Sequence, residues 1–205
     1  MILPSKSYFS IPQPSTTLSG AVFEKIATEK GINFYKRDSS LATDLSTNDE
    51  FAFDFMQNTN ADILIQILAT SPLVTAEEIT TFVNHMVDKK LETLVSVERN
   101  QISNLYKKTP VNFDKLKPNP LSQDMEPVYS YASVLMGWTY ESFKKNMEKL
   151  NCAYHGGESK TDYFEVSGLS TIDIDREEDF LLAESIIISK KYARTHKVEY
   201  YDDNL

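Results

Sequence analysis

Two carboxylates stand two residues apart late in the sequence, at Asp173 and Asp175. The stretch 171–175 alternates apolar and polar residues with period two, which predicts a strand whose isoleucines face a core while both carboxylates share the other face. Carboxylates at this spacing can share a divalent cation, and magnesium usually takes one or two carboxylates together with substrate phosphates. The spacing therefore indicates a magnesium site. The alternative is that Asp175 only caps a helix and Asp173 is only a solvated strand residue.

A helical pattern begins directly after this acidic pair. Phe180, Ala183 and Ile187 recur at intervals of three and four residues, as on one face of a helix. Asp175 and Glu178 have the spacing of a capping box at a helix start. The sequence thus predicts that the two carboxylates lie where a strand leads into a helix.

The elements expected upstream alternate between strand and helix. Strands are expected over residues 1–3, 9–11, 32–37, 62–68, 94–97, 128–137 and 152–155. Helices are expected after Ser19 as far as Gly31, over 46–58, from Thr75 to about residue 89, and over 140–150. The apolar run 62–68 is typical of a buried strand. This order predicts an α/β fold with a doubly wound, mostly parallel sheet and helices on both faces.

Length and composition limit the class of protein. A chain of 205 residues that is 41% hydrophobic can bury a sizeable core, and we expect one domain over 1–205. The single Cys152 excludes an intramolecular disulfide and the common zinc clusters, and with no secretory signal or long apolar run it favours a cytoplasmic protein. The net charge of −9 argues against binding to nucleic acid or anionic membranes.

Two segments fall outside this alternation. Residues 99–127 are polar, contain four prolines and are longer than most loops in compact domains. Such a segment is either functional, often in contacts, or a mobile surface excursion. Residues 193–205 are acidic and read as a tail.

Several short motifs occur in an order that is typical of one family. They are Lys36-Arg37, Leu41-Ala42-Thr43-Asp44, Thr70-Ser71-Pro72-Leu73 and Ile172-Asp173-Ile174-Asp175, the last followed by Glu178-Asp179-Phe180 and Ala183-Glu184. Together they resemble the acylneuraminate cytidylyltransferase family, which is CMP-N-acetylneuraminic acid synthetase-like, over residues 21–189. The resemblance implies a Rossmann-like fold of the nucleotide-diphospho-sugar transferase type. It also implies the transfer of CMP from CTP to the anomeric hydroxyl of an acidic sugar such as a sialic acid, with magnesium as cofactor and release of pyrophosphate. It further implies a homodimer in which residues 99–127 form an arm that reaches the partner.

The resemblance also assigns roles to individual residues. Asp173 and Asp175 match the catalytic, magnesium-binding carboxylates of the family. The nucleotide-binding residues that it implies are Arg37, Ser46 and Asn48 around the cytosine base, with Lys6 as a phosphate contact. The substrate-binding residues are Thr70, Ser71, Tyr131 and Ser133. Ser46 has a second interpretation as a helix cap.

The sequence departs from the family pattern at its beginning. The family's loop with Gly-Ser, which grips the triphosphate, is missing before the first helix, and the shortfall is about 30 residues, the size of one strand-helix-strand unit. Leu68 replaces a Gln, and Tyr131-Ala132 replaces an Asn-Gly pair. Two further hypotheses therefore stand beside the enzyme: a catalytically impaired binding or assembly protein with this fold, and an enzyme whose recorded sequence is truncated at the N-terminus.

Overall fold

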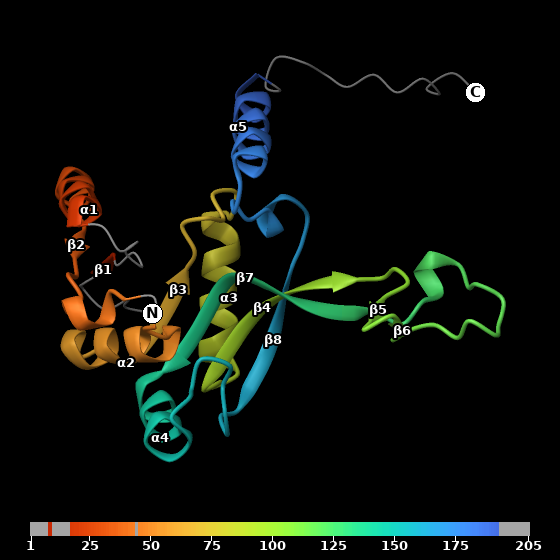
Figure 1. Ribbon diagram of the computed structural model, residues 1–205, viewed down its shortest axis with the longest axis horizontal. Helices are drawn as coiled ribbons and strands as arrows, with labels where there is room; N and C mark the ends of the chain where they lie inside the picture. Colours follow the sequence, from red (N-terminus) through yellow and green to blue (C-terminus); the bar gives the residue numbers. More distant parts are fainter. Residues whose placement is uncertain (1–7, 10–16, 44, 193–205) are drawn as a thin grey trace. The chain divides into compact units, whose positions relative to one another are not determined.

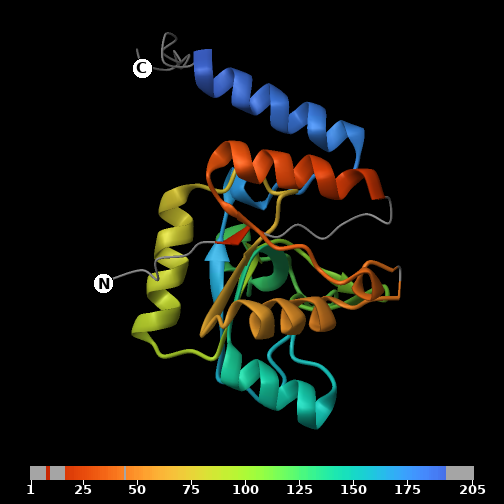
Figure 2. The same ribbon diagram turned by 90° about the vertical axis from the view of Figure 1, so that its left-hand side faces the viewer.

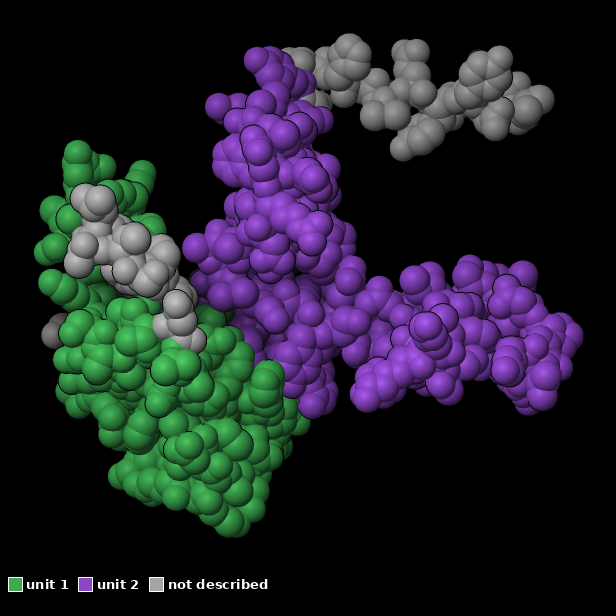
Figure 3. Space-filling view, in the orientation of Figure 1, with its two compact units in different colours: residues 1–66, 86–94, 137–162 green, residues 67–85, 95–136, 163–205 purple. Residues whose placement is uncertain are grey.

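The computed structural model describes residues 8–9, 17–43 and 45–192 (Figure 1). The chain divides into two compact units, coloured separately in Figure 3. Unit 1 comprises residues 1–66, 86–94 and 137–162, and unit 2 comprises residues 67–85, 95–136 and 163–205. Lys6, the strand expected at 1–3 and the tail at 193–205 lie outside the described residues.

The described elements alternate between helix and strand through most of the chain. The α-helices are α1 (Thr17–Lys30), α2 (Asn48–Thr59), α3 (Ala76–Asp88), α4 (Tyr140–Leu150) and α5 (Glu177–Tyr192). The strands are β1 (Tyr8–Phe9), β2 (Asn33–Phe34), β3 (Ile63–Ile67), β4 (Thr93–Asn100), β5 (Leu105–Tyr106), β6 (Thr109–Pro110), β7 (Val128–Thr139) and β8 (Thr161–Val166). Short 3-10 turns cover Ser39–Leu41, Ser122–Asp124 and Gly168–Thr171.

The strands form one larger sheet and two small pairs. The four-stranded sheet has the order β3-β7-β4-β8, β1 pairs in parallel with β2, and β5 pairs antiparallel with β6. The predicted α/β class, with a Rossmann-like and mostly parallel sheet, is confirmed. In unit 2, Phe82 of α3 packs edge-on against Phe164 of β8 at 5.4 Å, so α3 covers one face of β8 (Figure 2).

Local signals explain where the helices begin and end. Thr47 and Glu50 form a complete capping box at the start of α2, so Thr47 and not Ser46 is the N-cap. Thr75 and Glu78 form the predicted capping box of α3. Gly31 follows α1 with a φ of +66°, as expected for a residue that closes a helix.

Each unit has its own buried core. In unit 1 the indole of Trp138 packs edge-on against Phe143 at 5.7 Å, and both side chains are about 1% exposed. In unit 2 the buried side chains come mainly from α3, β4 and β7: Phe82, Val95, Val97, Val134, Leu135 and Met136. The residues of β4 are buried from Thr93 to Val97.

Four expectations about secondary structure are wrong. Residues 171–175 form no strand: a 3-10 turn ends at Thr171, and an irregular segment follows as far as α5. Residues 152–155 form no strand either, because the N–H groups of Ala153 and Tyr154 donate to the Asp49 carboxylate (N···Oδ1 2.5 and 2.7 Å). The strand that leads toward the acidic pair is β8, which was not predicted.

The third and fourth errors concern β3 and α5. β3 is an edge strand of the described four-stranded sheet, and Ile63 and Ile67 are 42% and 45% exposed rather than buried. At α5 the predicted Asp175–Glu178 capping box is replaced by Asp179, whose Oδ2 accepts the backbone N–H groups of Asp175 and Arg176.

Candidate active site

Among the described residues of unit 2, two side-chain oxygens are buried without a hydrogen-bond partner: Asp173 Oδ1 and Ser71 Oγ. Ser71 is 1% exposed. The backbone brings the two segments together, because the Ile174 N–H donates to the Thr70 carbonyl (N···O 2.9 Å). A buried oxygen without a partner is costly, so its retention indicates a group that a ligand completes. The structure thus brings together the predicted residues Thr70, Ser71 and Asp173.

The environment of Asp173 fits a magnesium ligand. Its unpartnered carboxylate oxygen is the hard, anionic type of donor that magnesium prefers. Asp175 is exposed two residues further on, two residues before the start of α5. Within the described residues no three His, Cys, Asp or Glu side chains cluster as a metal cage.

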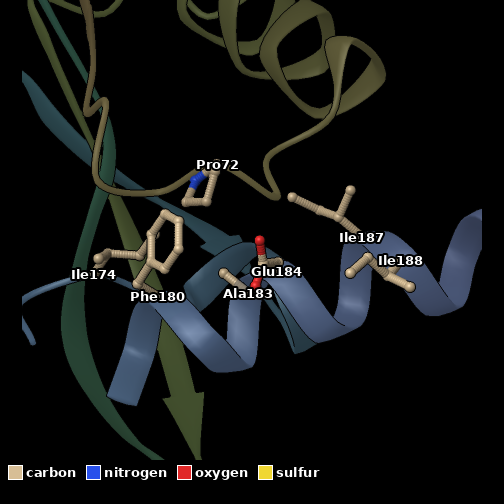
Figure 4. Close-up of a pocket in the computed structure, with 7 residues that line it drawn as sticks. All are labelled: Pro72, Ile174, Phe180, Ala183, Glu184, Ile187 and Ile188. Atoms are coloured by element: carbon tan, nitrogen blue, oxygen red, sulfur yellow. The ribbon is translucent and has the colours of Figure 1, made fainter. Parts of the chain in front are cut away.

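An apolar groove of about 340 Å³ flanks this acidic segment (Figure 4). One side consists of Pro72 and Ile174, the chain neighbours of Ser71 and Asp173. The other side is the α5 face formed by Phe180, Ala183, Glu184, Ile187 and Ile188. Ala183 is buried, whereas Phe180 and Ile187 are about half exposed. The groove therefore offers apolar surface directly beside the candidate metal ligand.

Tyr131 and Ser133 belong to β7 in unit 2. A hollow of about 420 Å³ is lined by Val97, Tyr129, Tyr131, Tyr163 and Glu165. The rings of Tyr131 and Tyr163 lie 6.3 Å apart, and burial, followed by the charge and hydrogen bond of Tyr163, raises the pKa of Tyr131. Ser133 has a left-handed backbone with φ of +54°, a conformation that costs a non-glycine residue about 1–2 kcal/mol.

Hydrogen bonds place these β7 residues beside the carboxyl ends of the neighbouring strands β3 and β4. The Leu68 N–H, just after β3, donates to the Val134 carbonyl (3.1 Å). Asn100, the last residue of β4, donates from its side chain to Ser130 Oγ (3.2 Å). Tyr131 and Ser133 therefore lie in the part of β7 that borders the Thr70–Ser71 turn.

The predicted nucleotide-binding residues Arg37, Ser46 and Asn48 lie in unit 1. The Arg37 guanidinium stands 5.4 Å from the ring centre of Phe51, one turn along α2 from Asn48. Burial lowers the pKa of Arg37. Ser46 Oγ lies 3.0 Å from Thr43 Oγ1, and Asn48 is the exposed first residue of α2. These three residues surround the start of α2, and Lys6 lies outside the described residues.

Tyr35 fixes the segment that carries Arg37. Its hydroxyl donates to Asp54 Oδ2 (2.5 Å), and its ring packs edge-on against Phe55 at 5.1 Å. Burial, followed by the hydrogen bond and charge of Asp54, raises the pKa of Tyr35 to about 12. The folded state therefore holds this proton more tightly than the unfolded chain, whose tyrosines titrate near 10.

We expect Tyr35→Phe to lower the free energy of unfolding by about 1 kcal/mol at neutral pH, because one hydrogen bond is lost. The full difference in the free energy of unfolding should be present below pH 10 and should be lost as the pH rises through 12. The reason is that the folded state, in which the pKa of Tyr35 is raised, favours the protonated hydroxyl. Urea unfolding of both proteins at a series of pH values measures this difference. A difference that stays constant to pH 12 would contradict the assignment.

Sequence reasoning identified Glu78 only as a helix cap and missed Glu98. Glu78 Oε1 accepts a hydrogen bond from Ser170 Oγ (2.5 Å), and Glu98 Oε1 lies 3.4 Å from Thr171 Oγ1. Both carboxylates thus hold the turn that precedes Asp173. The capping motif signalled Glu78, but partners 92 residues apart in sequence leave no local signal.

Comparison with known proteins shows the fold. Neither a model of a known family nor a curated protein matches the sequence. A structure of CMP:2-keto-3-deoxy-manno-octonic acid synthetase in complex with CTP is 12% identical and covers 91% of this chain and 82% of that chain with a TM-score of 0.61. 4-Diphosphocytidyl-2C-methyl-D-erythritol synthase from Anaerococcus prevotii is 12% identical over 84% of this chain and 78% of that chain, with a TM-score of 0.57.

A cytidylyltransferase from Leptospira borgpetersenii is also similar, at 13% identity over 91% of this chain and 79% of that chain with a TM-score of 0.50. The chain therefore has the α/β fold that these cytidylyltransferases share. Membership of the acylneuraminate cytidylyltransferase family stays a prediction. Among the described residues no helix is long and apolar enough to cross a membrane.

Proposed function

We propose that this protein is a nucleotidyltransferase that transfers CMP from CTP to a sugar hydroxyl and releases pyrophosphate. The acceptor that we propose is an acidic sugar such as a sialic acid, as the sequence motifs imply. The observation that carries the proposal is Asp173, whose buried, unpartnered oxygen lies in the segment bound to the Thr70–Ser71 turn. The fold shared with a synthetase solved with CTP supports it.

In the proposed reaction the sugar hydroxyl oxygen attacks the α-phosphorus of CTP. The bond from that phosphorus to the oxygen bridging the α- and β-phosphates breaks, pyrophosphate leaves with the electron pair, and the hydroxyl proton is released. Asp173, with Asp175 beside it, would hold magnesium, which neutralises phosphate charge and polarises the phosphoryl group when bound. The role of both carboxylates is thus positioning and electrostatics rather than covalent chemistry.

The remaining predicted residues would bind the two substrates. Arg37 and Asn48 present donors and an acceptor at the start of α2, which suit the edge of a cytosine base. Ser71 Oγ is a buried donor that lacks a partner, as a residue awaiting a substrate oxygen would be. Tyr131 and Ser133 lie in β7 beside the turn that contains Ser71, where a sugar acceptor would be bound.

The proposal is tested by pyrophosphate release from CTP and magnesium across a panel of acidic sugars. We expect release that depends on one of the sugars, with CTP preferred over UTP and ATP. A matched incubation without sugar controls for hydrolysis. Binding of CTP with no release from any sugar would favour a catalytically impaired binding or assembly protein, and the absence of both would reject the proposal.

A further inference from the structure

Glu78 uses both oxygens of its carboxylate, and each holds a different segment of unit 2. Oε2 accepts the Thr75 N–H (2.8 Å) and the Thr75 hydroxyl (2.7 Å), which closes the capping box of α3. Oε1 accepts the hydroxyl of Ser170 (2.5 Å). One side chain therefore joins the start of α3 to the 3-10 turn that precedes Asp173.

The chain contains a matched capping box that shows what this second bond adds. Glu50 accepts the Thr47 N–H (2.8 Å) and lies 3.1 Å from the Thr47 hydroxyl, as Glu78 does with Thr75. The hydrogen bonds described for Glu50 all stay within its own box, and Glu50 is exposed. The bond to Ser170 is thus beyond what a helix cap requires.

The bond to Ser170 bears directly on the candidate site. Ser170 is 6% exposed, so its hydroxyl is held in a dry environment where a hydrogen bond is strong. The segment is held again after Asp173, where the Ile174 N–H bonds to the Thr70 carbonyl. Asp173 stands between these two attachments, one on each side, and Thr70 and Thr75 belong to the same connection between β3 and α3.

The carboxylate of Glu78 is kept in its ionised, accepting form. Burial on its own would raise its pKa, but the hydrogen bonds from Ser170 and Thr75, helped by the charge of Lys190, outweigh burial and lower it. A carboxylate that stays ionised can accept on both oxygens at once, which a protonated group cannot do as well.

We propose that Glu78 is a positioning residue that, through Ser170, holds Asp173 beside the Ser71 turn in the geometry that binds a divalent cation with CTP. The proposal deepens the function proposed above and rests on it for the identity of the ligand. Residues that orient a metal ligand typically change metal affinity by about 10- to 100-fold when they are removed. We therefore expect a loss in that range without loss of the fold.

The experiment compares Ser170→Ala, Glu78→Gln, their double mutant and Glu50→Gln. Manganese binding in the presence of CTP, followed by electron paramagnetic resonance, reports the metal site directly. We expect affinity to fall about tenfold or more in Ser170→Ala and Glu78→Gln but to stay unchanged in Glu50→Gln. The double mutant should lose no more than the larger single effect, because both changes break the same link.

Hydrogen exchange tests the positioning role of Glu78 separately from the proposed function. Hydrogen exchange of the amides in 168–174 should accelerate in Ser170→Ala and Glu78→Gln relative to Glu50→Gln, whether or not any nucleotide binds. If the wild type binds no manganese with CTP, the proposed function fails while exchange still tests the link. Unchanged exchange, or unchanged manganese affinity in Ser170→Ala, would overturn the positioning role.

Discussion

Asp173→Asn should lower magnesium-dependent CTP affinity by more than about 100-fold, the upper end of the range for residues that only orient a ligand. The reason is that its unpartnered buried oxygen is the proposed ligand. The same substitution should leave the free energy of unfolding unchanged or raise it by up to about 1 kcal/mol, because it removes the charge of the carboxylate to which the buried, unsatisfied oxygen belongs. Calorimetric titration with CTP and magnesium, together with urea unfolding, measures both effects.

Asp175→Asn is the matched comparison, since it is the same change two residues further on at an exposed position. We expect Asp175→Asn to have the smaller effect and the double mutant to abolish magnesium-dependent CTP binding. Unchanged affinity in the double mutant would rule out the acidic pair as the metal site. A large fall in stability for Asp173→Asn would show that this carboxylate has a structural role instead.

If residues 99–127 mediate the predicted homodimer, replacing three apolar residues of this arm by aspartate should convert the dimer into a monomer. Six apolar side chains in this segment are between 53% and 87% exposed: Ile102, Leu105, Tyr106, Val111, Leu116 and Leu121. Exposed apolar side chains of this kind, two of them in β5 and the others elsewhere on the arm, suit a partner surface. We expect the combined Leu105→Asp, Leu116→Asp and Leu121→Asp variant to show half the wild-type mass by light scattering.

The control for the arm is Leu45→Asp, because Leu45 is 90% exposed in unit 1 and outside the arm. Deletion of residues 104–119 is a second route to the same monomer. It also removes Asn112, which donates to the carbonyls of Ile102 and Glu126 at the base of the arm. Dimers that persist in both arm variants would contradict the prediction, and a monomeric wild type would remove its premise.

The helices could be predicted because their signals are local. The capping boxes at Thr47 and Thr75 each lie within four residues, and the apolar spacing from Tyr140 to Leu150 gave both ends of α4. The strand β4 was predicted only as 94–97, because its polar residues beyond Val97 lead toward the arm. The strand β7 was predicted as 128–137, and the structure extends it by Trp138 and Thr139 to the start of α4. The elements that were predicted are thus those whose capping and spacing signals lie within the element itself.

Other features depend on partners far away in the sequence. Residues 171–175 alternate like a strand, but Ile172 and Ile174 are only half-buried, and the N–H of Ile174 bonds to a turn more than 100 residues earlier. β8 was missed although Phe164 faces α3 and Val166 is buried. The acidic pair was found from its residue types, whereas Glu78 required the fold, because its bond to Ser170 has no counterpart in the local sequence.

The hydrogen bond from the Ile174 N–H to the Thr70 carbonyl has a consequence for how this protein tolerates mutation. Both partners are main-chain groups, so side-chain replacement at either position leaves the bond in place. Proline at position 174 is the exception, since it alone lacks the donor. Most point mutations at Thr70 and Ile174 therefore leave the distance between the Ser71 turn and the acidic segment unchanged. The amino acids at these two positions can differ between sequences while the backbone shape of the site persists.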